Sequence, residues 1–164
     1  GSTSAGAKTL NLGTYTTAAA SGAAGATFGT AQTVLFKVTN SDGSACSQNG
    51  SSKWDIGINL TSTQYTTVAG NTLLLSGGTS ATAAGNVGVL IKTSVGPSVT
   101  AGTTNLDLSK GAIGYGTLLS GGTSTPGANF TDKIALTAQF AKTTATNGTA
   151  GTFTATIPLN VWYK

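Results

Sequence analysis

Very few side chains in this 164-residue chain could carry catalytic or metal chemistry. The sequence contains no His, Glu, Arg or Met, a single cysteine at position 46 and four aspartates. Zinc and transition-metal sites draw mainly on His, Cys and carboxylate ligands, and acid–base and triad catalysis draw mainly on His. Two-carboxylate hydrolysis needs a close pair of acids, and these aspartates are scattered. We therefore expect no enzyme, no metal site and no cofactor.

The charge pattern also narrows the classes of partner. Eight lysines and four aspartates leave a net charge of +4, and only 7% of residues are charged. Without Arg the chain is poorly equipped to read phosphates or bases, so we expect no nucleic-acid partner. No apolar run is long enough to predict a membrane span, and no signal peptide is recognisable, so the chain looks mature or trimmed. The Thr-, Ser- and Gly-rich composition favours an extracellular, assembled protein.

Three side chains remain as individual candidates. Cys46 has two main interpretations, half of a disulfide whose partner lies outside this sequence or a buried free thiol. A reactive thiolate is disfavoured because no His or Arg is present to stabilise it. Trp54 and Trp162 could form a sugar-stacking platform, but both lie on predicted strands, which favours packing in the core.

The last fourteen residues carry the strongest pattern in the chain. Apolar residues recur there at strict period two, which predicts a β-strand with one buried face. Two interpretations stay open: an ordinary half-buried C-terminal strand, or an edge strand offered to a partner strand. Pro158 removes one ladder donor, so part of this strand is expected to be unpaired on one side. The inward positions are Phe153, Ala155, Ile157, Leu159, Val161 and Tyr163.

Short alternating segments separated by turn signals occupy most of the remaining chain, and no segment keeps a helical period. This pattern predicts an all-β sandwich formed by one domain over residues 1–164, with residues 1–8 as a flexible N-terminal segment. Residues 18–31, rich in Ala, Gly and Ser, are predicted to form a loop. The predicted strands cover residues 8–17, 32–40, 53–60, 64–75, 87–95, 99–108, 111–119, 130–142 and 151–164.

The order of these segments resembles the major pilins of bacterial chaperone–usher fimbriae, of the type 1 and P pilus kind. The C-terminus is the most specific match, because pilins of this family end in an alternating apolar strand with a penultimate Tyr and a Gly fourteenth from the end, here Tyr163 and Gly151. The other similar segments are TLNLGTY at 9–15, VLFKVTN before Cys46, LLLSGGTSATAAGNVGVLI at 73–91 and IALTAQFA at 134–141.

The resemblance implies an immunoglobulin-like pilin sandwich that lacks its seventh strand and is completed by a donor strand. The resulting groove would be filled first by a periplasmic chaperone and then, after passage through an outer-membrane usher, by the N-terminal extension of a neighbouring subunit. It also implies a location in a fimbria on the cell surface, contact with a host receptor through the assembled fibre, and no insertion in a membrane. The residues implied to line the groove are Gly151, Phe153, Ala155, Ile157, Leu159, Val161 and Tyr163.

The sequence departs from the family pattern at its N-terminus. The first family cysteine, expected before the Leu10 segment, is absent, and no alternating donor arm is evident in residues 1–8. Either the chain is trimmed or the subunit differs, in which case residues 8–15 could themselves act as the donor. Two other functions stay open: a carbohydrate-binding adhesin domain, and a subunit of another strand-exchanging filament that needs no chaperone.

Overall fold

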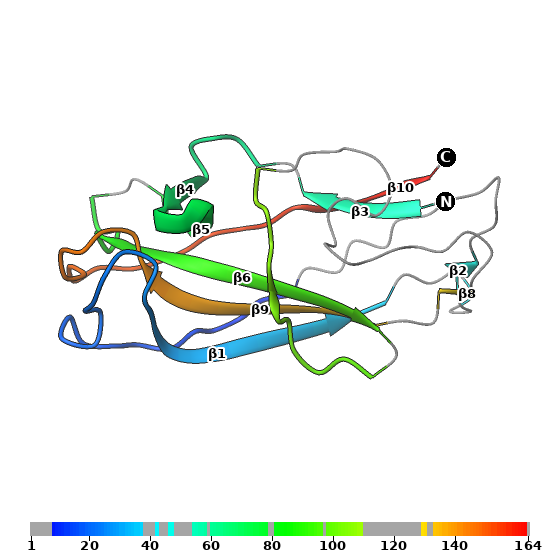
Figure 1. The fold of residues 1–164 in the computed structure, drawn as a ribbon, viewed down its shortest axis with the longest axis horizontal. Helices are drawn as coiled ribbons and strands as arrows, with labels where there is room; N and C mark the ends of the chain where they lie inside the picture. Colours follow the sequence, from blue (N-terminus) through cyan, green and yellow to red (C-terminus); the bar gives the residue numbers. More distant parts are fainter. Residues whose placement is uncertain are drawn as a thin grey trace.

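The computed structural model shows an all-β chain with almost no helix, as the sequence predicted (Figure 1). It describes residues 8–37, 42, 46–47, 54–58, 60–78, 81–96, 98–109, 129–130 and 133–163. The strands are β1 (Thr27–Phe36), β2 (Cys46–Ser47), β3 (Trp54–Ile58), β4 (Tyr65–Val68), β5 (Thr72–Ser76), β6 (Val87–Gly96), β7 (Thr104–Asn105), β8 (Asn129–Phe130), β9 (Lys133–Lys142) and β10 (Leu159–Tyr163).

The largest unit is an antiparallel sheet of six strands in the order β1-β9-β6-β5-β4, with β7 paired to β6. Its long strands β1, β9 and β6 lie along the length of the molecule (Figure 1). Strand β9 lies between β1 and β6, with Thr137 opposite both Thr33 and Lys92. This central position explains why apolar residues appear on both faces of β9.

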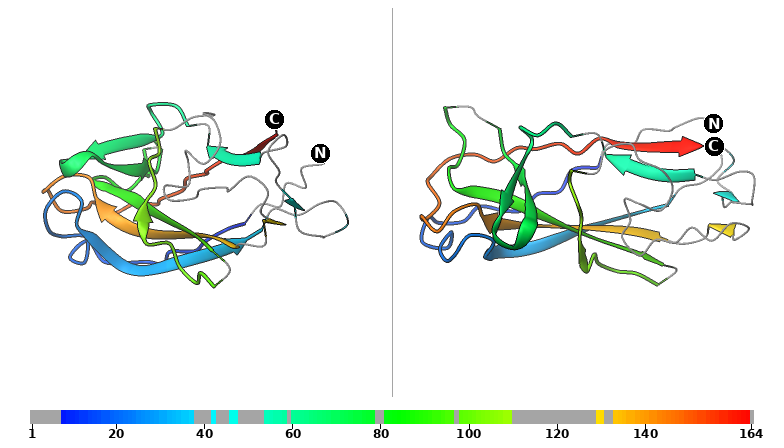
Figure 2. Two further views of the ribbon diagram at one scale, coloured as in Figure 1. Left: turned by 45° about the vertical axis from the view of Figure 1, so that its right-hand side comes forward. Right: turned by 45° about the horizontal axis from the view of Figure 1, so that its top comes forward.

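Two short antiparallel pairs complete the described strands. Strand β10 pairs with β3, from Leu159 opposite Ile58 to Tyr163 opposite Trp54. Strand β2 pairs with β8, which places Cys46 opposite Phe130. The β3–β10 pair lies apart from the three long strands in Figures 1 and 2, so the arrangement is consistent with a β-sandwich.

The main core cluster lies on one face of the six-stranded sheet and follows the period-two alternation of its strands. Ile134, Leu136 and Ala138 of β9 belong to it, as do Val89 and Ile91 of β6. A smaller cluster on other positions contains Val68, Leu74, Leu90 and Ala141. The sheet is therefore covered on both faces over its central strands.

Several predicted elements were wrong in extent. The predicted strand 64–75 is divided by the 3₁₀ turn at Ala69–Asn71 into β4 and β5, and within 99–108 only Thr104–Asn105 forms a strand. Residues 8–16 belong to no strand, and β1 begins at Thr27, inside the predicted loop. Within the predicted strand 151–164, only residues 159–163 form a strand ladder. For residues 8–16 and 153–158, alternation recorded which side chains contact the core, whereas a strand also requires a neighbouring backbone. The predicted strand 111–119 lies outside the described residues.

The only helical element among the described residues is a short 3₁₀ turn over Ala69–Asn71. No helix in this part of the chain has the length and apolarity required to cross a bilayer.

Candidate functional site

Two extended segments run over the core face of the six-stranded sheet without joining it. We call residues 8–15 the N-terminal segment and residues 151–158 the C-terminal segment. Figures 1 and 2 show them, in dark blue and orange-red, running lengthwise in opposite directions. Among the described residues, a single isolated bridge at Thr152 is the only β-type pairing that either segment makes. The C-terminal segment then leads directly into β10.

Apolar side chains of both segments pack against the main core cluster. Leu10 and Leu12 do so from the N-terminal segment, and Phe153 and Ile157 from the C-terminal segment, and all four are only partly buried. Ala155, which lies between the latter two in the alternation, is exposed. The two segments thus bury apolar side chains as strands would, while their backbones lack the ladder bonds of strands.

The C-terminal segment is fastened at its first residues. The Thr152 backbone N–H donates to the Thr82 carbonyl over 2.8 Å, and the Ala84 N–H donates to the Thr152 carbonyl over 2.9 Å. A Cβ at Gly151 would collide with the backbone of Ala83 and Ala84, so this close approach requires glycine. Beyond Thr152, none of residues 153–158 makes a backbone hydrogen bond to another described residue.

Phe153 holds the next position by packing. A Cβ at Gly77 would collide with the Phe153 ring, so the absence of a side chain at Gly77 makes room for that ring. The ring also meets Phe140 of β9 edge-on, with centroids 5.6 Å apart. Phe153 is therefore seated between the β5–β6 connection and the central strand.

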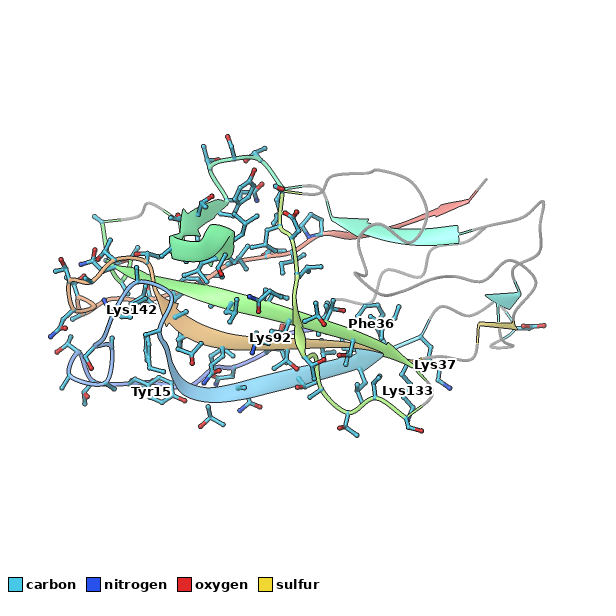
Figure 3. All side chains as sticks on the ribbon, in the orientation of Figure 1. Tyr15, Phe36, Lys37, Lys92, Lys133 and Lys142 are labelled. Atoms are coloured by element: carbon cyan, nitrogen blue, oxygen red, sulfur yellow. The ribbon has the colours of Figure 1, made fainter. Side chains whose placement is uncertain are left out.

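The N-terminal segment is fastened at its last residue, Tyr15. The Thr30 backbone N–H donates to the Tyr15 hydroxyl over 2.8 Å, and the ring packs edge-on against Phe28 and Phe140. The hydrogen bond from the Thr30 backbone is the main cause that lowers the pKa of Tyr15, because it stabilises the phenolate. Figure 3 shows Tyr15 beside the first half of β1.

Lys142 is the one fully buried charged side chain among the described residues. Its ammonium donates to the backbone carbonyls of Asn86 and Thr146, and burial lowers its pKa. In Figure 3, Lys142 lies at one end of the sheet, and Lys37 and Lys133 lie at the other end. These contacts tie the 143–149 loop to the sheet, so we interpret Lys142 as a structural cation.

The other predicted site residues fall where the structure describes less. For Leu159, Val161 and Tyr163 it describes the backbone, paired with β3, and it likewise describes only the backbone of Cys46, Trp54 and Trp162. In the described part of the chain, no three His, Cys, Asp or Glu side chains come together as metal ligands would.

Sequence reasoning missed Gly29, Gly77 and Phe140 as partners of the two segments. Gly29 lay in a predicted loop, and nothing local in the sequence links Gly77 to Phe153, which lies far along the chain. No family model matches this chain, and no curated protein is similar enough in sequence to count as a relative. The functional interpretation therefore depends on the geometry of the two segments.

Proposed function

We propose that this chain is a non-catalytic structural subunit of an extracellular fimbria, polymerised by donor-strand complementation. Its fold would be an immunoglobulin-like pilin sandwich that lacks its seventh strand. A strand from a neighbouring subunit would complete the sandwich in the fibre. A periplasmic chaperone would occupy the same place before assembly at an outer-membrane usher.

One observation carries the proposal: apart from the bridge at Thr152, the N-terminal and C-terminal segments pack on the core without pairing their backbones to other described residues. Leu10, Leu12, Phe153 and Ile157 all remain partly exposed although they contact the main core cluster. We call the region bounded by these side chains the acceptor region. Both of its sides are extended chain of the kind to which an added strand can bond.

The expected chemistry of insertion follows from this arrangement. A donor strand would bond through its main chain to the C-terminal segment, and its alternate apolar side chains would cover Ile157 and the exposed Ala155. Insertion would thus bury apolar surface and satisfy backbone groups in one step. Head-to-tail donation between identical subunits does not close on itself, so it produces a filament.

The first test uses a synthetic peptide in which apolar and polar residues alternate. Calorimetry measures its binding to the chain, and chemical unfolding measures the stability of the complex. A peptide with the same composition, but with its apolar residues grouped together, is the matched control. We expect the alternating peptide to bind and the control peptide not to bind. At a free concentration about 100 times its Kd, the alternating peptide should raise the free energy of unfolding by about 2.7 kcal/mol.

Two substitutions locate the binding. Ile157→Lys should abolish binding, because it puts a charge in the acceptor region. Leu35→Lys should leave binding unchanged, because Leu35 is 39% exposed and does not belong to the core cluster. Equal binding by both variants, or no binding of the alternating peptide to the unaltered chain, would contradict the proposed function.

A further inference from the structure

We propose that Tyr15 is a latch that holds the N-terminal segment against the sheet, and that the β-bulge of β1 at Gly29 is the socket for its ring. The latch itself is independent of any partner. Its consequence, the positioning of one side of the acceptor region, rests on the proposed function.

The socket begins with an interruption of the β1–β9 ladder. The register shifts between Phe28 and Gln32, and Gly29 within the interruption has φ +73°, a conformation that favours glycine. A Cβ at Gly29 would lie 2.6 Å from Cζ of Tyr15, closer than real contacts allow. Gly29 therefore serves twice, because it permits the bulge and leaves space for the ring.

The bulge also directs backbone groups toward side chains instead of toward the backbone of β9. The Thr30 N–H donates to the Tyr15 hydroxyl over 2.8 Å. The Gly29 carbonyl accepts a hydrogen bond from Nε2 of Gln139 over 2.7 Å. Without Tyr15, the Thr30 N–H would have no partner among the described residues, so the phenol completes the hydrogen bonding of the bulge.

Aromatic neighbours fix the orientation of the ring. Its centroid lies 6.1 Å from that of Phe28 and 6.0 Å from that of Phe140, and both contacts are edge-on. Phe28 and Phe140 stack on each other at 5.5 Å. The ring thus packs edge-on against an aromatic pair supplied by two neighbouring strands, β1 and β9.

The N-terminal segment has no other polar attachment to the sheet among the described residues. Its other hydrogen bond is local, from the Gly13 N–H to Oδ1 of Asn11. Leu10 and Leu12 add apolar contacts that are only partly buried. Tyr15 therefore supplies the directional contact that sets where this segment lies, and Phe140 connects it to Phe153 on the other side of the acceptor region.

The test uses two variants with two matched controls. Tyr15→Phe keeps the ring and removes the hydroxyl, and Tyr65→Phe makes the same change at a tyrosine remote from the socket. Gly29→Ala places a Cβ against the ring. Gly70→Ala introduces alanine at a similar φ of +75° where a Cβ would meet nothing within 4 Å. The difference between the glycine variants therefore isolates the collision with Tyr15 from the backbone strain.

The readouts are amide exchange at Thr30 and the methyl resonances of Leu10 and Leu12, both by NMR. We expect Thr30 exchange to become about fivefold faster in Tyr15→Phe, as for loss of one hydrogen bond, and faster still in Gly29→Ala. Both variants should also move the Leu10 and Leu12 methyl signals toward solvent-exposed values. Tyr65→Phe and Gly70→Ala should leave all of these signals near those of the unaltered chain.

Unchanged Thr30 exchange in Tyr15→Phe, or identical behaviour of Gly29→Ala and Gly70→Ala, would overturn the latch. Peptide binding separates the latch from the proposed function. If the latch positions the acceptor region, Tyr15→Phe should also weaken binding of the alternating peptide, whereas Tyr65→Phe should not. If the unaltered chain binds no peptide, the proposed function is wrong. The rate of amide exchange at Thr30 in Tyr15→Phe still tests whether Tyr15 is a latch.

Discussion

The six-stranded sheet and the acceptor region bury apolar side chains in the same core but treat their backbones differently. In the sheet, β9 is paired along its length with β6 and over most of its length with β1. In the acceptor region, residues 153–158 contribute Phe153 and Ile157 to the same cluster and belong to no strand. The comparison shows that contact with the core and membership of a sheet are separate properties of a segment.

The difference has an energetic meaning. A paired strand satisfies its N–H and C=O groups inside the protein and exposes little apolar surface. An unpaired extended segment leaves those groups to water or to an incoming strand, and its apolar side chains remain partly exposed. Under the proposed function, a donor strand would supply the backbone hydrogen bonds that residues 153–158 lack, whereas the central strands β6 and β9 already pair with each other.

The largest expected effect compares the same substitution in the two regions. Ile134→Ala, at a fully buried position of β9, should lower the free energy of unfolding by about 3–4 kcal/mol. Ile157→Ala, at a partly buried position, should lower it by only about 1 kcal/mol, because part of its surface already faces water. Urea unfolding of both variants measures the difference.

Repeating the pair with saturating alternating peptide sharpens the comparison. The cost of Ile157→Ala should then rise toward that of Ile134→Ala, because the added strand would bury the Ile157 side chain. Equal costs without peptide would show that both regions are equally complete.

An intermediate effect is expected where the C-terminal segment is seated. Gly77→Ala should destabilise the chain by about 1–3 kcal/mol, because the added methyl group collides with the Phe153 ring. In the background of Phe153→Ala the same change should cost little, since the ring is gone. A double-mutant cycle in urea measures this coupling. Additive costs would mean that Gly77 does not seat Phe153.

The smallest expected effect is on the pH dependence of the free energy of unfolding, and it comes mainly from Lys142 at the end of β9 in the six-stranded sheet. Burial lowers the pKa of Lys142, so the folded chain releases this proton at a lower pH than the unfolded chain does. Stability should therefore rise with pH in the window between that lowered pKa and the usual 10.5. Tyr15, whose pKa is also lowered from 10.0, contributes with the same sign.

Lys142→Met separates the two contributions. The unfolding free energy of this variant, measured against pH, should rise less steeply than that of the unaltered chain, because the contribution of Lys142 is removed and that of Tyr15 remains. Parallel pH profiles would exclude Lys142 as a source of the rise.

The central sheet was the part most accessible to prediction. Alternation and turn signals placed strands at 87–95 and 130–142, where the structure has β6 and β9. The strand predicted at 53–60 corresponds to β3. These segments were predictable because their buried faces and their backbone partners coincide.

Prediction was less successful where a segment has an apolar face on the core but no paired backbone. The alternation at 8–17 and 153–158 recorded side chains that contact the core, but the backbone partners that would complete a ladder are absent among the described residues. The start of β1 was missed because Gly29 reads locally as a loop residue, whereas in the fold it forms a bulge. Residue types alone do not distinguish a loop glycine from a glycine in a strand that leaves space for an aromatic ring, as Gly29 does for Tyr15.

The sequence by itself determined which chemical groups are present and where apolar and polar residues alternate, because composition and period-two spacing are local properties of the chain. From these came the all-β class and the apolar faces of its strands. Only the tertiary structure decided which backbones pair, that Tyr15 reaches Thr30, and that Phe153 rests on Gly77. Those outcomes depend on segments distant in sequence meeting in space, and hydrogen bonds and ring contacts require that meeting.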